Sequence, residues 1–519
     1  MAFFLLVVWI NYLNKLIKYI KVSTLVVLLV FANINLARAQ EMLGLTMGNY
    51  AGSLSALSNP GNINQSKIFF DIHLTSVALF ARNNFAYIPK NDATLYDLFL
   101  KSSDQLPVYG KDNNHFTYYN NHDLKFAQVN VRVQGPSAMF YSERHGFGIS
   151  TAVRFFTSGN RIPWEIPVVS YEGLDYDPLH NIQFNDYSFD VGSSAWFELG
   201  LTYAYDIIKY NRTQLTAGIT VKPLYGLGGI DGTIQNGNYI ILDDSTVNFL
   251  NVDTDLGYAL PIDYDDNTLG VSPTVKGSGL GIDIGVVYSK KRNDIIKHYH
   301  VRPCEKPYDA YIYRIGFSLL DIGRVNYKYN SQLHSFENVS AYWPSIDTTG
   351  FQSMNSFVGN LSGVFYGTRD GSFRENNFKV GLPTAASFQG DFYLFKNIYL
   401  NTFWIHPIKL YKYSLRRNAV VAISPRFETK WFEVSVPVSL YNYKYPRVGL
   451  AVRFLYFTIG TERLGTYLGM ADLNGMDIYG SIKINFTKGG CKFKGPNKCL
   501  NYEYGISEDD HKLYRKRNR

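Results

Sequence analysis

The chain has 519 residues, of which 16% are aromatic and only 18% are charged. This composition is too aromatic and too weakly charged for a disordered protein, and no apolar run after the N-terminus is long enough for a transmembrane helix. Of the net charge of +8, residues 1–39 carry +4 and residues 487–519 carry +5, which leaves −1 for residues 40–486. A nucleic-acid-binding protein has a basic stripe on its folded body, so no nucleic-acid partner is expected.

Residues 1–39 are typical of a secretory signal peptide. Basic residues between positions 15 and 21 precede an apolar run from Thr24 to Ala32, and Ala37-Arg38-Ala39 is a small-x-small cleavage site. The alternative is a transmembrane anchor, which the short apolar run and the cleavage signature disfavour. We therefore expect an exported protein.

Residues 40–66 are small and turn-rich, as in Asn59-Pro60-Gly61-Asn62. This segment could be tucked into the mouth of a barrel as a lumen plug, or it could be a loop that leads into the first strand. Regular alternation of apolar and polar residues begins at Lys67.

Alternation then recurs along most of the chain. It is cleanest from Ala127 to Gln134, and it returns in the last regular stretch, Ile478 to Phe486. Successive side chains of a strand point to opposite faces, and about ten residues suffice to cross a bilayer as a tilted strand. We count about fourteen strands, with short links alternating with long ones. Residues 226–276 are expected to form a long outer loop plus a hairpin, with one weak strand near Tyr239 to Leu250, and residues 331–375 are expected to be loop.

The pattern predicts an all-β fold for residues 67–486: a transmembrane antiparallel β-barrel of about 14 strands, with short periplasmic turns and long outer loops. Repeated soluble sandwiches also alternate, but they explain the long strands and unequal links less well. The expected location is the outer membrane of a Gram-negative bacterium, with outer-membrane lipid as a partner.

Charged residues on the polar faces of these strands are expected to line the lumen, because a charge at the lipid midplane costs about 2–4 kcal/mol. They either form a network of arginine–carboxylate pairs that braces the barrel, which we favour, or a selectivity path for a solute. The lumen-facing candidates are Asp71, Arg132, Arg154, Glu198, Lys222, Asp283, Arg314, Arg426, Glu428, Glu433, Arg447, Arg453 and Lys483.

Nothing in the sequence indicates an enzyme. No Gly-x-Ser-x-Gly motif stands at a strand-to-helix turn, and no cluster of four ligands has the spacing of a zinc site. No catalytic residue, metal or cofactor is expected, and a barrel hydrolase is a remote alternative.

The three cysteines and the basic C-terminal tail stand apart from the strands. Cys491 and Cys499 are close enough in sequence to form a small disulfide loop in an exported protein, and Cys304 is left over. Residues 487–519 are expected in the periplasm, where peptidoglycan, lipid headgroups or an acidic periplasmic protein could attract them. A solvated tail is an equal alternative.

Several short motifs resemble a known family. They are Gln134-Gly-Pro-Ser137, Gly279-Leu-Gly-Ile-Asp-Ile-Gly285, the stretch from Arg314 to Gly323, Leu382-Pro383-Thr384, and Gly475 to Lys483. In them the chain resembles a family of Bacteroidota outer-membrane β-barrels, which is similar in layout to FadL-like fatty-acid transporter barrels and to the barrel subunit of the type IX secretion system. Over residues 45–486 the resemblance implies fourteen strands and a plugging N-terminal segment.

The resemblance implies an apolar lumen in a lipid transporter, whereas the inward set of this chain is heavily charged. We therefore expect a non-enzymatic cell-envelope barrel that acts as a pore or as a membrane anchor for an envelope complex. The alternatives are FadL-like uptake of a hydrophobic solute, or a secretion-associated or adhesin-like scaffold that uses the loops near 90–120, 160–186, 226–276 and 331–375.

Overall fold

The fold is described by a computed structural model, which covers residues 42–110, 113–142, 144–185, 187–210, 212–292, 310–346 and 352–486. The signal peptide, Cys304, the Cys491–Cys499 pair and the basic tail lie outside these residues and stay predictions. Among the residues that the structure describes, no helix is long and apolar enough to cross a membrane.

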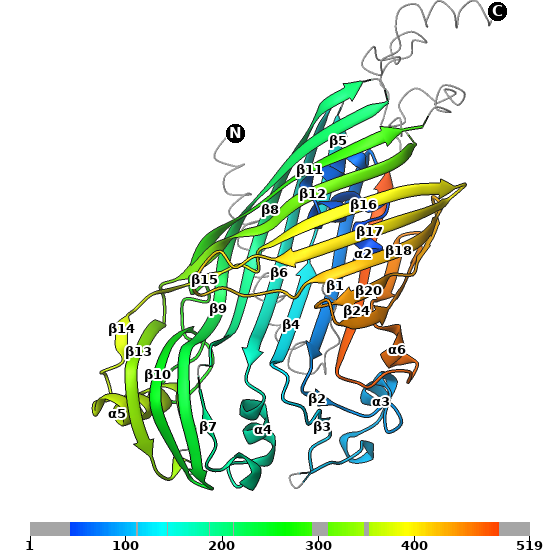
Figure 1. Cartoon of the computed structure of the whole chain (residues 1–519). Helices are drawn as coiled ribbons and strands as arrows, with labels where there is room; N and C mark the ends of the chain where they lie inside the picture. Colours follow the sequence, from blue (N-terminus) through cyan, green and yellow to red (C-terminus); the bar gives the residue numbers. More distant parts are fainter. Residues whose placement is uncertain are drawn as a thin grey trace, which may run out of the picture. The chain divides into compact units, whose positions relative to one another are not determined.

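One antiparallel sheet forms a ring and closes on itself (Figure 1). Closure occurs at β1 (Phe70–Asn83), which pairs on one side with β4 and β5 and on the other with the last strand, β24. Phe70 pairs with Phe486, so the first and last strands meet edge to edge. Closure leaves no free sheet edge, as a membrane-spanning sheet requires.

Several wall strands are divided into shorter segments, so that 21 of the 22 segments of the sheet make fourteen strands, and the remaining segment, β7 (Gln183–Phe184), pairs with β9 in an outer link. The predicted number of strands is confirmed. In order, the wall consists of β1; β4 (Lys125–Gln134) with β5 (Ser137–Ser142); β6 (His145–Ile162); β8 (Phe189–Tyr210); β9 (Thr213–Asp243); β10 (Thr246–Ala259) with β11 (Gly277–Lys291); β12 (Tyr311–Tyr327) with β13 (Ser331–Trp343); β14 (Phe373–Glu375) with β15 (Phe378–Gly381) and β16 (Ala385–Phe395); β17 (Ile398–Pro407); β18 (Val420–Glu428); β19 (Phe432–Ser435) with β20 (Val438–Tyr441); β21 (Tyr445–Val448) with β22 (Leu450–Phe454); β23 (Phe457–Thr461); and β24 (Gly475–Phe486).

The links between the strands are unequal. At one end, turns such as the one between β16 and β17 are only two residues long, although the link from β11 to β12 is longer. At the other end, the links contain short elements of their own (Figure 1). These are β2 (Ala86–Tyr87), α3 (Leu95–Leu100), η3 (Ser103–Gln105), β3 (Thr117–Tyr118), α4 (Glu165–Glu172), η4 (Asp177–Leu179), β7 (Gln183–Phe184), α5 (Met354–Tyr366) and α6 (Leu464–Tyr467).

Two predicted loops were largely wrong. Within residues 226–276 the expected hairpin is present but longer than expected, since β9 continues to Asp243 and pairs with all of β10, and within residues 331–375 there are β13 and α5. The register of β9 with β10 shifts in three places, which breaks the period of two that marks a strand in sequence. Cross-strand pairing therefore overrides the loop-like composition of Gly, Asp and Asn.

Side chains on the wall follow the alternation that the sequence shows. In β18, Ala422, Ser424 and Arg426 are buried inside the barrel, while Ile423 and Phe427 on the other face are 51% and 41% exposed. Exposed aromatic residues also gather at the short-turn end, where an interfacial belt is expected. They include Phe395, Phe427, Trp431, Phe454, Phe457 and Phe486.

If the outer face meets hydrocarbon, a charge placed there should be costly according to depth. Ile423→Arg, near the middle of β18, should lower the free energy of unfolding by about 2–4 kcal/mol. The control Phe395→Arg, beside the turn at Lys396, should cost much less because arginine there reaches water. Urea unfolding from lipid vesicles measures both. Equal costs would contradict a lipid-facing wall.

Candidate functional site

The N-terminal segment lies inside the ring of strands. It consists of α2 (Leu43–Thr46), η1 (Gly52–Leu57) and η2 (Pro60–Gln65), and every residue of η2 is buried. Asn59 precedes η2 and has no exposed surface. Its side-chain amide donates to the carbonyl oxygens of Val286 and Phe317, each at 3.1 Å, and to Gln389 Oε1 at 3.0 Å. One asparagine thus joins the segment to three wall strands, β11, β12 and β16.

The wall is shaped to accept this segment. A Cβ atom on Gly218 of β9 would lie 2.5 Å from the backbone nitrogen of Gly61, and one on Gly285 of β11 would lie 2.3 Å from Asn59 Oδ1. Any larger residue at either position would collide with η2. We call residues 42–66 the plug segment.

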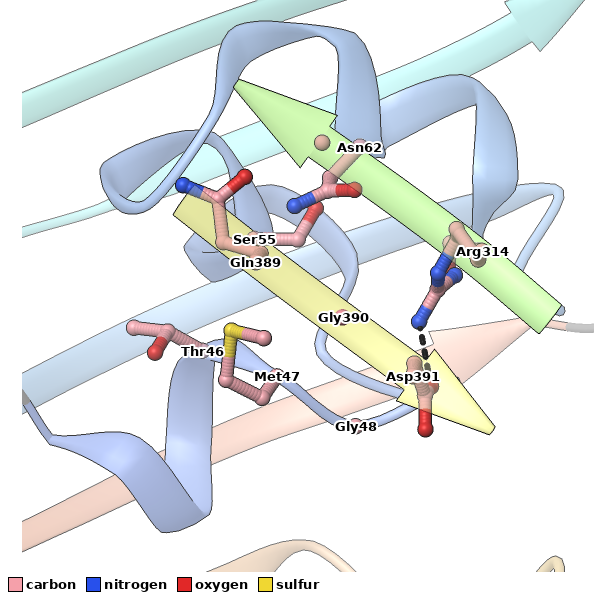
Figure 2. A pocket seen from close by; sticks show the side chains of 11 residues that line it. Thr46, Met47, Gly48, Ser55, Asn62, Arg314, Gln389, Gly390 and Asp391 are labelled. Carbon is pink, nitrogen blue, oxygen red and sulfur yellow. Dashed lines mark hydrogen bonds and ion pairs between the residues drawn. The ribbon is translucent and has the colours of Figure 1, made fainter. Parts of the chain in front are cut away.

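Cationic wall residues also hold the plug segment. Lys483 donates to the carbonyl oxygens of Tyr50 and Ala51, and Arg426 Nη1 donates to that of Met47 at 2.9 Å. Arg314 reaches the carbonyl oxygen of Gln65 at 3.2 Å while it pairs with Asp391 at 2.8 Å. Figure 2 shows Arg314, Asp391 and Gln389 beside plug residues such as Met47 and Ser55.

One cluster of buried charges centres on Asp321 in β12. Its carboxylate accepts two hydrogen bonds from Arg154, at 2.9 and 3.0 Å, and one each from Lys222 and Arg417, both at 2.6 Å. Lys222 also pairs with Asp283 at 2.7 Å. Glu198 is joined to the cluster through Arg132 at 2.5 Å and Arg154 at 3.3 Å.

A second cluster centres on Arg426, whose side chain is 1% exposed. Its guanidinium lies 3.2 Å from Asp391, 3.1 Å from Glu428 and 3.9 Å from Glu433. Arg453 pairs with Glu433 at 3.0 Å, and Lys67 pairs with Glu428 at 3.1 Å. This cluster lies against the same plug segment, since Glu428 also accepts from the backbone N–H of Asn49.

The remaining lumen-facing candidates are also inside. Asp71 has no exposed surface and accepts hydrogen bonds from the backbone and hydroxyl of Ser53, while Arg447 lies 3.7 Å from Glu462. Of the thirteen residues, Arg132 is the most exposed, at 14% of its side chain. These thirteen residues belong to separate clusters rather than to one continuous row along the lumen, and most of them are paired with an opposite charge.

Asp321, Arg417 and Asp391 are buried in the lumen but are not among the predicted lumen-facing residues. Asp391 shares a strand face with Gln389, so the alternation in the sequence could have predicted that it faces the lumen. Asp321 could not be predicted in this way, because strict alternation from Arg314 places it on the outer face. A bulge turns it inward: Leu320 and Asp321 are both buried, and the register of β11 with β12 shifts between Ile282 and Ile284. The backbone φ of Asp321 is +55°.

Arg417 belongs to a second segment that enters the barrel, the link between β17 and β18 at residues 408–419. Tyr413 and Leu415 of this inward loop bond to the backbone of Gly381, and Arg416 bonds to Ser158 of β6. Asn418 bonds to Gln128 of β4. The loop therefore contacts widely separated wall strands, and no sequence signal distinguishes it from an ordinary polar link.

Small polar cavities remain between the plug segment and the wall. One is lined by Arg132, Arg154, Lys222, Asp283, Asp321 and Arg417 together with plug residues, and its volume is about 40 Å³. A second, shown in Figure 2, measures about 10 Å³. Spaces of this size and polarity hold a few waters rather than an organic solute.

The Asp321 cluster should be important for stability. Asp321→Asn removes the charge that neutralises Arg154, Lys222 and Arg417, so we expect a loss of about 3–5 kcal/mol in the free energy of unfolding. The control is Asp123→Asn, whose ion pair with Lys444 is exposed, and it should hardly change the unfolding midpoint. Urea titration of the refolded barrel compares them. Equal midpoints would show that the cluster does not brace the wall.

Solved structures with a similar fold are outer-membrane channels of low sequence identity. A FadL homologue of Pseudomonas aeruginosa is 11% identical, with 87% of this chain and 99% of that chain covered at a TM-score of 0.37. A mutant of the monoaromatic hydrocarbon channel TodX is 9% identical, with 84% and 95% covered at 0.35. The toluene transporter TodX of Pseudomonas putida is 9% identical, with 87% and 99% covered at 0.29. The strand pairing alone carries the barrel assignment.

The sequence comparison is more specific. No curated protein matches the chain. The predicted similarity to the type IX barrel subunit stays a prediction. Residues 60–462, well over half of the chain, match the family of unknown function DUF5723, and the protein is therefore a member of the DUF5723 family.

Proposed function

We propose that the protein is a non-enzymatic β-barrel of the Gram-negative outer membrane, with a lumen closed from both ends, and that it anchors an envelope complex. The observation that carries this proposal is that two segments, the plug segment and the inward loop, both lie inside the lumen. The band of exposed Leu, Ile, Val and Phe on the outer face supports placement in a bilayer.

The presence of both segments inside the lumen argues against a permanently open pore. The plug segment bonds to β11, β12, β16, β18 and β24, and the inward loop bonds through Arg417 to Asp321, which also binds Arg154 and Lys222. Opening a path requires breaking several buried charged contacts at once. Each broken contact leaves a charge unpaired in a nearly dry interior, which is strongly unfavourable.

Uptake of a hydrophobic solute is the second candidate in the transport class. The structures of TodX are named for toluene and monoaromatic hydrocarbon transport by that protein. In this chain, however, arginine, lysine and carboxylate side chains line the lumen cavities. A hydrophobic solute there would displace water from charged groups without replacing their hydrogen bonds. The charged lumen therefore favours the anchor.

The anchor proposal assigns the partner to the periplasmic tail. Residues 487–519 have nine Lys or Arg against four acidic residues, so that their net charge is +5. An anionic polymer such as peptidoglycan, or an acidic periplasmic protein, would be attracted by this charge.

Conductance in planar bilayers tests the closed lumen. The intact protein should show no steady conductance, whereas a variant that lacks residues 42–66 and has residues 409–416 replaced by a Gly-Ser linker should conduct ions. Removal of residues 102–106, in the outer link between β1 and β4, is the control and should stay silent. Steady conductance of the intact protein would refute the closed lumen.

Co-purification tests the anchor. Full-length protein should retain a cell-envelope partner that is lost when residues 487–519 are removed, and the loss should be reproduced by raising the salt concentration, which screens exposed charges. Heat-modifiable migration in detergent shows that the truncated barrel is folded. Identical partners with and without the tail would refute this part of the proposal.

A further inference from the structure

Three arginines meet inside the barrel at the end that carries the outer loops. Arg82 lies near the end of β1, Arg447 lies in β21, and Arg463 follows β23. Each residue is only 6% exposed. Arg82 and Arg447 contact the same ring, that of Tyr441, while Arg463 Nη1 and the Cα atom of Arg82 both lie beside Gly475, so the three like charges repel one another. They form a cluster of like charge, which we call the arginine triad.

Aromatic rings hold two members of the triad. The Arg82 guanidinium lies 4.7 Å from the ring centroid of Tyr445 and 5.3 Å from that of Tyr441, and the Arg447 guanidinium lies 4.5 Å from the Tyr441 centroid. Tyr441 is itself fixed by hydrogen bonds with Gln128 and Asn418. The faces of aromatic rings attract cations, but they accept no strong hydrogen bond from the N–H groups.

Neighbouring acids neutralise only part of this charge. Glu462 and Asp477 carry two negative charges against three positive ones, and both are themselves engaged with the protein. Glu462 accepts a hydrogen bond from the backbone N–H of Leu43 at 3.0 Å and lies 3.7 Å from Arg447. Asp477 accepts from the backbone N–H of Glu462 at 3.1 Å. With both acids ionised, the cluster has a net charge of +1.

Several guanidinium donors of the triad have no acceptor within the described residues. Nε, Nη1 and Nη2 of Arg447 donate no hydrogen bond, and neither does Nε of Arg82 or Nη1 of Arg463. The contrast with Arg453 is clear, since its Nε bonds to Glu433, its Nη1 to the carbonyl oxygen of Lys430 and its Nη2 to that of Thr429. Buried charged donors without acceptors are costly, so the triad requires an additional acceptor.

We propose that the arginine triad is a binding site for a small oxyanion such as inorganic phosphate. Guanidinium groups match the planar spread of oxyanion oxygens and bind them through paired N–H donors. One negative charge would neutralise the cluster, and the oxygens would accept from the unpaired donors. Tyr441 connects the site to the inward loop through Asn418, whereas the three arginines belong to β1, β21 and the link after β23, and binding of an oxyanion does not depend on the anchor role.

The test measures the free energy of unfolding at increasing phosphate concentrations, with phosphate replacing chloride so that the ionic strength stays constant. It uses full-length protein refolded in detergent without lipid. Wild-type protein should gain stability with the logarithm of phosphate concentration, because a ligand of the folded state stabilises it. Arg447→Gln should abolish the gain. The matched control, Arg453→Gln, removes a buried arginine whose three nitrogens each donate a hydrogen bond, and it should keep the gain even though it destabilises the barrel.

Equal gains in Arg447→Gln and wild type would refute the site, because phosphate also stabilises proteins generally by exclusion from their surface. The absence of any gain in wild type would refute it as well. Equilibrium dialysis with labelled phosphate measures binding directly in the folded protein, and Arg447→Gln should bind at least tenfold more weakly. If Arg447→Gln does not fold, Arg82→Gln gives the same comparison. The lipid-free preparation distinguishes free phosphate from a lipid headgroup.

Discussion

The interior of this barrel depends on one constraint: each buried charge must have a partner of opposite charge. Asp321 meets this requirement for Arg154, Lys222 and Arg417 at once, with contacts of 2.6 to 2.9 Å. Isolated charges of this kind would cost several kcal/mol each in a dry interior. The paired cluster joins β6, β9, β12 and the inward loop, so pairing of charge also fixes the positions of these elements.

The same constraint explains why the plug segment is well held despite its small, polar composition. Its short helices satisfy part of its backbone internally, and wall side chains bond to several of the remaining carbonyl and N–H groups. Arg314, Arg426 and Lys483 supply the donors, while Asp71 and Glu428 supply the acceptors. The charged lumen and the plug segment are therefore complementary surfaces, and this complementarity favours a closed barrel over an open one.

The arginine triad is the exception to complete pairing, and this is why it is informative. Arg453 in the same lumen donates a hydrogen bond from each of its three guanidinium nitrogens, and within the described residues Arg132, Arg154 and Arg426 each lack a hydrogen-bond partner at Nε alone. Arg447, in contrast, contacts aromatic rings and one carboxylate beyond hydrogen-bonding distance. Among the described arginines of the lumen, Arg447 is the one whose three nitrogens all lack a hydrogen-bond partner, and the proposed oxyanion would supply these acceptors at the end near the outer loops.

The sequence by itself determined the wall. Period-two alternation, as in β18, decides which side chains face lipid and which face the lumen, because the pleat of a strand leaves each side chain only two directions. For residues 40–66 the sequence left a lumen plug and a loop leading into the first strand as alternatives. The hairpin of β9 and β10 was predicted only as a weak and short one, because bulges interrupt the period of two by which a strand is recognised in sequence.

Only the tertiary structure decided which residues meet inside the wall. The bulge that turns Asp321 inward, the entry of residues 408–419 and the convergence of Arg82, Arg447 and Arg463 all depend on contacts between residues far apart in the chain. Local sequence fixes only the direction of a side chain relative to its own strand. Its partner is set by barrel closure and register, which are properties of the whole sheet.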